Sequence, residues 1–274
     1  MESRPHITRY ASQGVTLLGD QRRPGGVTLA FTERTGGYSL MPYASLNLGD
    51  ACGDREETVA ANRSMLLQAL DCGQLGERLV NPRQVHGSEV LVISDASDAA
   101  VARARHDARE GVDAIVCSAR EVPVLLCFAD CVPVVLVAPG AFAVIHSGWR
   151  GTYARISQKA LRALVQLTGV AASEVLAYVG PHIGGADYEV SRGLAEQFAE
   201  AFGEGAAPDA THVDLGFAVR KTLMEAGVRE EAIWDECPST ASCTKRFYSY
   251  RAEGGTCGRH GAIAVLLDQD EREV

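Results

Sequence analysis

Two apolar segments that meet at Pro139-Gly140 constrain the fold of this chain more than any other feature. They lie within residues 130–152 and have the pattern of two apolar β-strands joined by a turn. Pro followed by Gly suits the centre of a turn, because Pro fixes φ and Gly accepts φ > 0. A tight turn at this point would place Pro133 opposite His146 in an antiparallel pair.

Cys131 lies two residues before Pro133, so the two side chains share one face of the strand. Diagonal partners in an antiparallel pair lie roughly 7–8 Å apart at the backbone, and their side chains come closer. One metal ion could therefore contact the sulfur of Cys131 and a nitrogen of His146. The inference requires a tight turn, because one extra loop residue would turn one side chain to the other face. A buried hairpin without any site is the alternative.

A glycine-rich turn follows the hairpin and carries Arg150 between Gly148 and Gly151. Apolar residues beyond the turn recur at helical spacing, which predicts a helix. A strand, a glycine turn and the start of a helix, with an arginine in the turn, are typical of an anion-binding site. A packed crossover turn without a ligand would give the same pattern.

Composition excludes several classes of protein. The chain has 274 residues, 46% of them hydrophobic, which is enough for a sizeable core, and a net charge of −9. It has no long lysine or arginine cluster, which argues against nucleic acid or an anionic membrane as a partner. The N-terminus lacks a hydrophobic signal region, so we expect a cytoplasmic protein. Eight cysteines without a CxxC pair then favour free thiols or metal ligands over a disulfide framework.

Strand and helix patterns follow one another along the whole chain. Strands are predicted for the apolar segments 27–32, 90–93, 111–118, 122–128, 174–179 and 262–267. Helices are predicted for 56–70, 191–202 and 215–226, whereas the alanine-rich segment 96–109 is predicted to be an exposed loop or a weak helix without a function. Strands outnumber helices, and hairpins mix with crossovers. We therefore expect residues 1–274 to form a single α+β domain with a mixed, largely buried β-sheet flanked by helices.

Seven short motifs occur in an order that resembles one known family. The motifs are TERTGG at 32–37 with PYASLNLG at 42–49, QVHG at 84–87, ADCVPV at 129–134, HSGWRG at 146–151, GPHIG at 180–184, YEV at 188–190 and FYSYR at 247–251. Each motif is weak alone, but together and in this order they are specific. The chain resembles the YfiH family, also called the laccase-domain or polyphenol oxidase family, from about residue 31 to residue 263.

The resemblance implies a zinc-dependent enzyme of purine nucleosides. Members of the family phosphorolyse adenosine, inosine, guanosine and methylthioadenosine, and they also deaminate adenosine. The family's zinc ligands correspond here to His86, Cys131 and His146. Three protein ligands leave zinc an open fourth position, and water in that position ionises near pH 7. The resemblance also implies purine nucleosides and phosphate as partners.

The remaining site residues are predicted from the same motifs. Asp130, next to a ligand, is expected to be catalytic and to shuttle a proton to the purine base. Arg150 is expected to hold phosphate through charge-assisted hydrogen bonds, and Arg34 is a second candidate for this role. Asn47 and Gln84 complete the expected substrate-binding set.

Other functions fit parts of the pattern. A cysteine hydrolase or deamidase would use Cys131 as nucleophile and His146 as base, and it would not need His86. A multicopper oxidase, which the older family name suggests, needs many histidines in His-x-His pairs, whereas this chain has seven histidines and no such pair. Copper bound by the same three ligands would support only incidental oxidation. A non-catalytic binding protein has no positive support, because the metal ligands are present.

Overall fold

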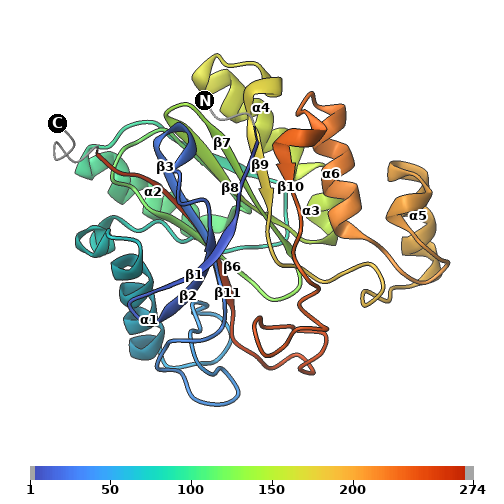
Figure 1. Ribbon diagram of the computed structural model, residues 1–274, viewed down its shortest axis with the longest axis horizontal. Helices are drawn as coiled ribbons and strands as arrows, with labels where there is room; N and C mark the ends of the chain where they lie inside the picture. Colours follow the sequence, from blue (N-terminus) through green and yellow to red (C-terminus); the bar gives the residue numbers. More distant parts are fainter. Residues whose placement is uncertain (1–3, 269–274) are drawn as a thin grey trace.

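The predicted hairpin lies at the centre of the fold (Figure 1). The structure is a computed structural model and describes residues 4–268. Strand β7 (Val132–Ala138) pairs antiparallel with β8 (Ala141–Ser147), and Pro133 lies opposite His146 as predicted. Every residue of both strands is buried, which explains why neither strand shows polar alternation in the sequence.

A mixed sheet extends outward from this hairpin on both sides. Within residues 4–268 it has six strands in the order β10-β9-β7-β8-β5-β4, with parallel pairs only at its two edges. The additional strands are β4 (Val90–Ile93), β5 (Ala114–Cys117), β9 (Leu176–Val179) and β10 (Ile233–Trp234). The α+β class and the mixed, buried sheet are therefore confirmed.

A second sheet accompanies the first, although the sequence pattern predicts only one. Among the described residues it has five antiparallel strands in the order β1-β2-β3-β11-β6. Its strands are β1 (Thr8–Ser12), β2 (Val15–Gly19), β3 (Val27–Thr32), β6 (Val124–Phe128) and β11 (His260–Leu266). The chain passes from β6 to β7, and so from one sheet to the other, through residues 129–131. Asp130 has φ 89° in this turn. This left-handed conformation is uncommon for a residue other than glycine, and the sequence pattern does not predict it.

The two faces of the five-stranded sheet serve two different cores. Along β11, Ala262, Ala264 and Leu266 belong to the larger core, which the six-stranded sheet shares. Ile263 and Val265 alternate with them and belong to a smaller core closed by helix α1 (Glu56–Ala69). Alternate residues of a strand point to opposite faces, so this division follows directly from the pleat.

Helices cover the outer faces of both sheets (Figure 1). The remaining ones are α2 (Asp98–Gly111), α3 (Trp149–Tyr153), α4 (Ile156–Thr168), α5 (Arg192–Phe202) and α6 (Leu215–Glu225). Short 3₁₀ turns complete the fold at η1 (Pro24–Gly26), η2 (Gly73–Arg78), η3 (Ala172–Glu174), η4 (Glu204–Ala206) and η5 (Glu230–Ala232). None of the helices in residues 4–268 has the length and apolar character needed to cross a bilayer.

The alanine-rich segment 96–109 contributes most of the regular helix α2, so the helix alternative is confirmed and the exposed loop is wrong. Ser97 caps the helix, because its side chain accepts a hydrogen bond from the backbone N–H of Ala100. Val101, Ala104 and Ala108 are buried at helical spacing and attach α2 to the main core. The apolar face consists mostly of alanine, so its pattern in the sequence is faint.

The stability of this fold is expected to depend on pH through His260. It is buried among the rings of Phe128, Phe247 and Tyr248, and burial lowers its pKa to about 3. The unfolded chain binds a proton at this histidine below pH ~6.5 while the folded chain does not, so stability falls as pH drops from ~6.5 toward 3. At pH 5 the loss should be on the order of 2 kcal/mol.

Urea unfolding at pH 7.5 and pH 5 should show this loss in the wild type and a smaller one in His260→Phe, which keeps a ring in the aromatic cage. His106→Gln, on the exposed side of α2, is the control and should follow the wild type. Equal pH dependence of wild type and His260→Phe would show that His260 does not titrate between these two pH values.

Candidate metal centre

Three side chains predicted as metal ligands meet at one end of the central hairpin. Cys131 directly precedes β7, His146 lies near the end of β8, and His86 comes from the loop before β4. Their ligand atoms all lie within 4.8 Å of one another. The imidazole rings of His86 and His146 meet edge to face, with centroids 4.8 Å apart. Two neutral imidazoles and a thiolate are a donor set that suits zinc, and three protein ligands leave one coordination position open.

Asp113 holds two of these ligands in place. Its Oδ1 accepts hydrogen bonds from Nδ1 of His146 at 2.7 Å and from the backbone N–H of His86 at 2.9 Å. Its Oδ2 accepts the backbone N–H groups of Val85 at 3.2 Å and Gly87 at 2.7 Å. The carboxylate therefore orients the ring of His146 so that Nε2 faces the other ligands. It also fixes the turn in which His86 adopts φ 57°. A carboxylate behind a metal-binding histidine is the usual arrangement around zinc.

The charges at the site favour the metal-binding form of Cys131. Burial alone would raise the pKa of this thiol, but His146 and His86 lower it to about 6. Burial alone would lower the pKa of His146, but Cys131 and Asp113 raise it to about 9. Burial likewise opposes ionisation of Asp113, and its hydrogen bonds lower its pKa instead. Cys131 is thus a thiolate at neutral pH, the form that binds a metal, whereas His146 carries a proton that a bound metal would displace.

Gly148 leaves room for the ligands. A Cβ at this position would lie 3.1 Å from the sulfur of Cys131 and 3.0 Å from Cδ2 of His86. Its φ of −75° and ψ of 173° are open to any residue, so the requirement for glycine comes from the close approach and not from the backbone conformation. This glycine, which the sequence pattern assigns to an anion-binding turn, therefore has a definite steric role beside the metal ligands.

Asp130 lies next to the site, but its carboxylate is engaged elsewhere. Oδ1 accepts a hydrogen bond from the hydroxyl of Thr240, and Oδ2 accepts the backbone N–H of Arg251, both at 2.7 Å. The carbonyl oxygen of Asp130 accepts the backbone N–H of Ile183 at 2.9 Å. Asp130 thus ties three loops to the turn that carries Cys131. Its role as a proton shuttle stays a prediction.

Arg34, Asn47 and Gln84 have contacts typical of structural residues. Arg34 donates to the carbonyls of residues 44 and 244, pairs with Glu253 at 2.9 Å and stacks on Tyr248. Asn47 is fully buried and bonds to the backbone of residues 49 and 259. Gln84 binds both the N–H and the C=O of residue 127. These contacts are with the surrounding loops and β6 rather than with the three ligand atoms, so substrate binding by these residues stays a prediction.

Arg150 differs from the predicted turn residue because it lies inside the five-residue helix α3. Its guanidinium is 4.5 Å from the centre of the Trp149 ring, and the residue is exposed. Tyr188 lies close enough to Arg150, Arg251 and Cys131 for their charges to act on its pKa. Burial, followed by Cys131, raises that pKa to about 12, so the phenol stays neutral and can donate a hydrogen bond. These residues form the polar surroundings of the three ligands.

Sequence reasoning missed Asp113 and gave no role to Tyr188 or Arg251. An acidic residue at the start of an otherwise apolar strand was the available signal for Asp113, since burial there requires hydrogen-bond partners. Tyr188 and Arg251 lie in two of the family motifs, YEV and FYSYR. Nothing in their local sequence indicates that the fold brings them beside Cys131.

Replacement of Asp113 by asparagine should weaken metal binding by roughly 10–100-fold, as expected for the outer partner of a histidine ligand. The amide keeps the shape but loses the charge and one of the two acceptor oxygens, so some of the four N–H groups lose their partner. Competition with a chromophoric chelator measures this affinity. Asp54→Asn, in the loop before α1, is the control and should keep full affinity. Unchanged affinity in Asp113→Asn would contradict the orienting role.

Known proteins resemble this chain over most of its length. A family model described as multi-copper polyphenol oxidoreductase laccase matches residues 28–267. A purine nucleoside phosphorylase of Deinococcus radiodurans is 36% identical over 262 residues, which cover 92% of this chain and 94% of the relative. Purine nucleoside phosphorylase YfiH of Escherichia coli is 32% identical, covering 89% and 96%. The crystal structure of YlmD from Geobacillus stearothermophilus has a TM-score of 0.82 at 29% identity, covering 96% and 100%.

Proposed function

Because this chain belongs to the family described as multi-copper polyphenol oxidoreductase laccase, several relatives of which are named purine nucleoside phosphorylases, we propose that it is a zinc-dependent purine nucleoside phosphorylase that also deaminates adenosine. The observation that carries the proposal is the open three-donor centre of His86, Cys131 and His146 with Asp113 behind it. Such a centre matches a catalytic metal site rather than a closed structural one.

Zinc is the metal that the donor set favours. Two imidazoles and one thiolate at a single position suit Zn²⁺, while a copper oxidase needs several copper sites built from many histidines. Within residues 4–268, His86, Cys131 and His146 are the one group of three or more such side chains close enough to share an ion. Zinc bound there would supply a Lewis acid at its open position.

The residues around the metal ligands support a nucleoside and phosphate as substrates. Phosphorolysis transfers the pentose from the base to phosphate, so the site must hold an anion and protonate the departing purine. Arg150 and Arg251 bring positive charge to the neighbourhood of Tyr188. Their guanidinium groups are suited to bind phosphate through paired hydrogen bonds. The neutral phenol of Tyr188 is available to donate a hydrogen bond to the substrate.

Deamination of adenosine makes different demands on the same site. Water replaces the amino group at C6 and ammonia leaves, so no anion has to be bound. The two activities would therefore share the metal ligands and differ in their need for the arginines.

A nucleoside panel with and without phosphate, read by mass spectrometry, tests the proposal. Free base and pentose 1-phosphate should appear only when phosphate is present, while inosine should form from adenosine without phosphate. A chelator should remove both activities, and zinc should restore them. A cysteine hydrolase built on Cys131 and His146 would retain its activity in the chelator. Recovery with copper but not with zinc would contradict the choice of metal.

Arg150→Ala should lower phosphorolysis by at least ~10-fold more than deamination, because only phosphorolysis binds an anion and a charged hydrogen bond contributes roughly 1.5–3 kcal/mol. The ratio of the two rates in one preparation is the measurement, so a change in the amount of folded protein cancels. Arg192→Ala, at an exposed position of α5, is the matched control and should leave the ratio unchanged. Equal losses of both activities would assign Arg150 to the fold.

A further inference from the structure

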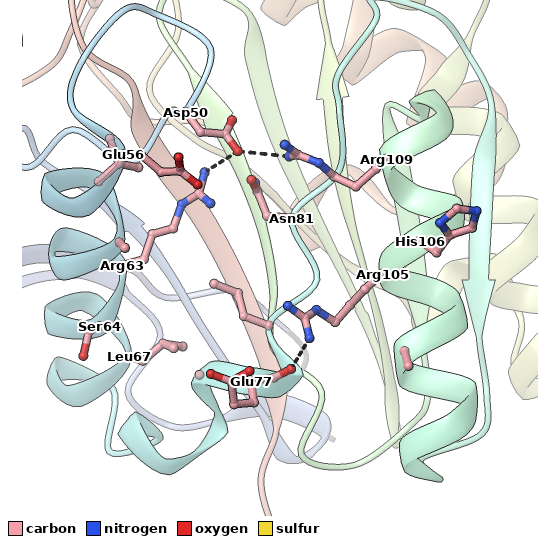
Figure 2. A pocket seen from close by; sticks show the side chains of 15 residues that line it. Asp50, Glu56, Arg63, Ser64, Leu67, Glu77, Asn81, Arg105, His106 and Arg109 are labelled. Carbon is pink, nitrogen blue, oxygen red and sulfur yellow. Dashed lines mark hydrogen bonds and ion pairs between the residues drawn. The ribbon is translucent and has the colours of Figure 1, made fainter.

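A pocket lies apart from the metal ligands, between α1 and α2 (Figure 2). Its volume is about 680 Å³, which is within the usual range for small-molecule sites. Helix α1 supplies one wall, α2 the opposite wall and η2 the end, while Asn81 lies on its floor. None of its lining residues is a proposed metal ligand or a direct partner of one, so the pocket is a separate site.

Three arginines line this pocket in a chain whose net charge is −9. They are Arg63 on α1 and Arg105 and Arg109 on α2. Asp50 is the one carboxylate of the described residues within ion-pair distance of any of them. Two further acids, Glu56 and Glu77, line the pocket at exposed positions and form no ion pair with these arginines. The lining therefore holds as many carboxylates as arginines, but among these acids only Asp50 is placed to pair with the arginines.

Asp50 marks the place where an anion fits. Its Oδ2 lies 3.0 Å from Nη1 of Arg109 and 3.5 Å from Nη2 of Arg63, so one carboxylate bridges the two helices. Nη2 of Arg63 is buried and makes no hydrogen bond, although the ion pair with Asp50 is close by. Figure 2 shows the side chains of Asp50, Arg63, Arg109 and Asn81 pointing toward one another. Asn81 donates through Nδ2 to the carbonyl of Leu125, so its Oδ1 remains to accept a hydrogen bond from a donor on the body of a ligand rather than from the phosphate.

The fixed parts of the pocket hold Arg63 in position for a ligand. Nε of Arg63 donates to the carbonyl of Leu48 at 2.9 Å, so the backbone holds the guanidinium while its Nη2 lies near Asp50. Arg105 donates to the carbonyl of Glu77 at 2.7 Å from the other wall. Asp50, in contrast, lies in a loop and keeps 31% of its side chain exposed, so a stronger anion can displace it. A phosphate offers more oxygens than a carboxylate and suits arginine better.

Apolar side chains also line the pocket. They are Val59 and Leu67 of α1, both almost fully buried, and Leu79 in the segment after η2. We propose that this pocket binds a phosphate monoester with an apolar or aromatic body, of the size of a nucleoside monophosphate. The phosphate takes the place of the Asp50 carboxylate between Arg63 and Arg109, and the body lies against the apolar wall. Binding in this pocket does not depend on the proposed enzymatic function.

Isothermal titration calorimetry with adenosine 5′-monophosphate tests the proposal, with adenosine and inorganic phosphate as separate ligands. Because the metal centre is itself proposed to bind adenosine and phosphate, the signal of this pocket is the part of the binding that the double variant Arg105→Gln/Arg109→Gln loses. That part should be tighter for the monophosphate than for either fragment, and it should weaken as sodium chloride rises. In the double variant Arg105→Gln/Arg109→Gln the affinity should fall by at least about 10-fold, since the Arg109 contact to the phosphate and the positive charge of Arg105 on the same wall are both lost. Asp50→Asn should raise the affinity several-fold, because it removes the competing carboxylate. Arg103→Gln, on the same helix but outside the pocket, is the control and should bind like the wild type.

Each of the other outcomes overturns the proposal. Equal affinity of the wild type and the double variant would place the ligand elsewhere. Loss of the monophosphate affinity in Arg150→Ala, with the double variant unaffected, would assign the ligand to the metal centre. Binding of inorganic phosphate as tight as that of the monophosphate would show an ion site without a pocket for the body. Weaker binding in Asp50→Asn would make Asp50 a support of the pocket rather than a competitor of the ligand.

Discussion

Cys131→Ala is expected to abolish phosphorolysis and deamination together, with each rate falling by a factor of at least ~1,000. The substitution removes the single anionic ligand of the centre and leaves only the imidazoles of His86 and His146. Two neutral nitrogens bind zinc far more weakly than the complete set, so the purified variant should contain less than about a tenth of the wild-type metal. Elemental analysis and the nucleoside panel measure the two effects on the same sample.

Cys127→Ala is the matched control for this variant, since it lies four residues earlier in the chain and belongs to β6. Its sulfur donates to the carbonyl of Leu48, and burial raises its pKa to about 11, so it is a neutral thiol without a catalytic role. We expect its replacement to cost ~1–3 kcal/mol of stability and to leave metal content unchanged. Loss of deamination alone in Cys131→Ala would contradict a metal centre shared by the two activities.

The hairpin shows which part of the metal centre can be predicted from local sequence rules alone. A proline–glycine turn fixes the register, and the period of two along a strand then decides which side chains face His146. Cys131 and His146 could therefore be placed together without any knowledge of the rest of the fold. His86 could be added only through the family resemblance, because its loop approaches the hairpin by a connection that strand rules do not describe.

The parts that could not be predicted depend on contacts between distant segments. Asp113 reaches the turn at 85–87 and His146, which lie 26 to 33 residues away along the chain. Arg34 contacts the loop at 244–253, more than 200 residues away, so its charge gave no sign of a structural partner. The five-stranded sheet depends on the pairing of β3 and β6 with β11 near the end of the chain. In each case the partner lies too far along the chain for any local pattern to indicate it.

Gly148→Ala should damage the metal centre by adding one methyl group. The new Cβ would lie 3.1 Å from the Cys131 sulfur and 3.0 Å from Cδ2 of His86, which is tighter than carbon contacts normally allow. Asp113 fixes the turn of His86, and Cys131 is bonded directly to the first residue of β7. Neither ligand can therefore move away from the added methyl group without disturbing its surroundings. A displacement of a ligand by a fraction of an ångström changes metal geometry directly. We expect metal affinity and both activities to fall by ~100-fold or more.

Gly193→Ala tests whether this effect is steric rather than a general property of glycine replacement. Position 193 lies in α5, and a Cβ added there would meet no atom within 4 Å. Alanine at this position should therefore raise stability by up to ~1 kcal/mol and leave the metal untouched. Thermal unfolding should show Gly148→Ala folded, because its backbone dihedrals suit alanine. A folded Gly148→Ala with normal zinc content and normal rates would contradict the close approach of this residue to the ligands. A folded variant that has lost its metal would establish that the ligands beside Gly148 require a glycine at this position.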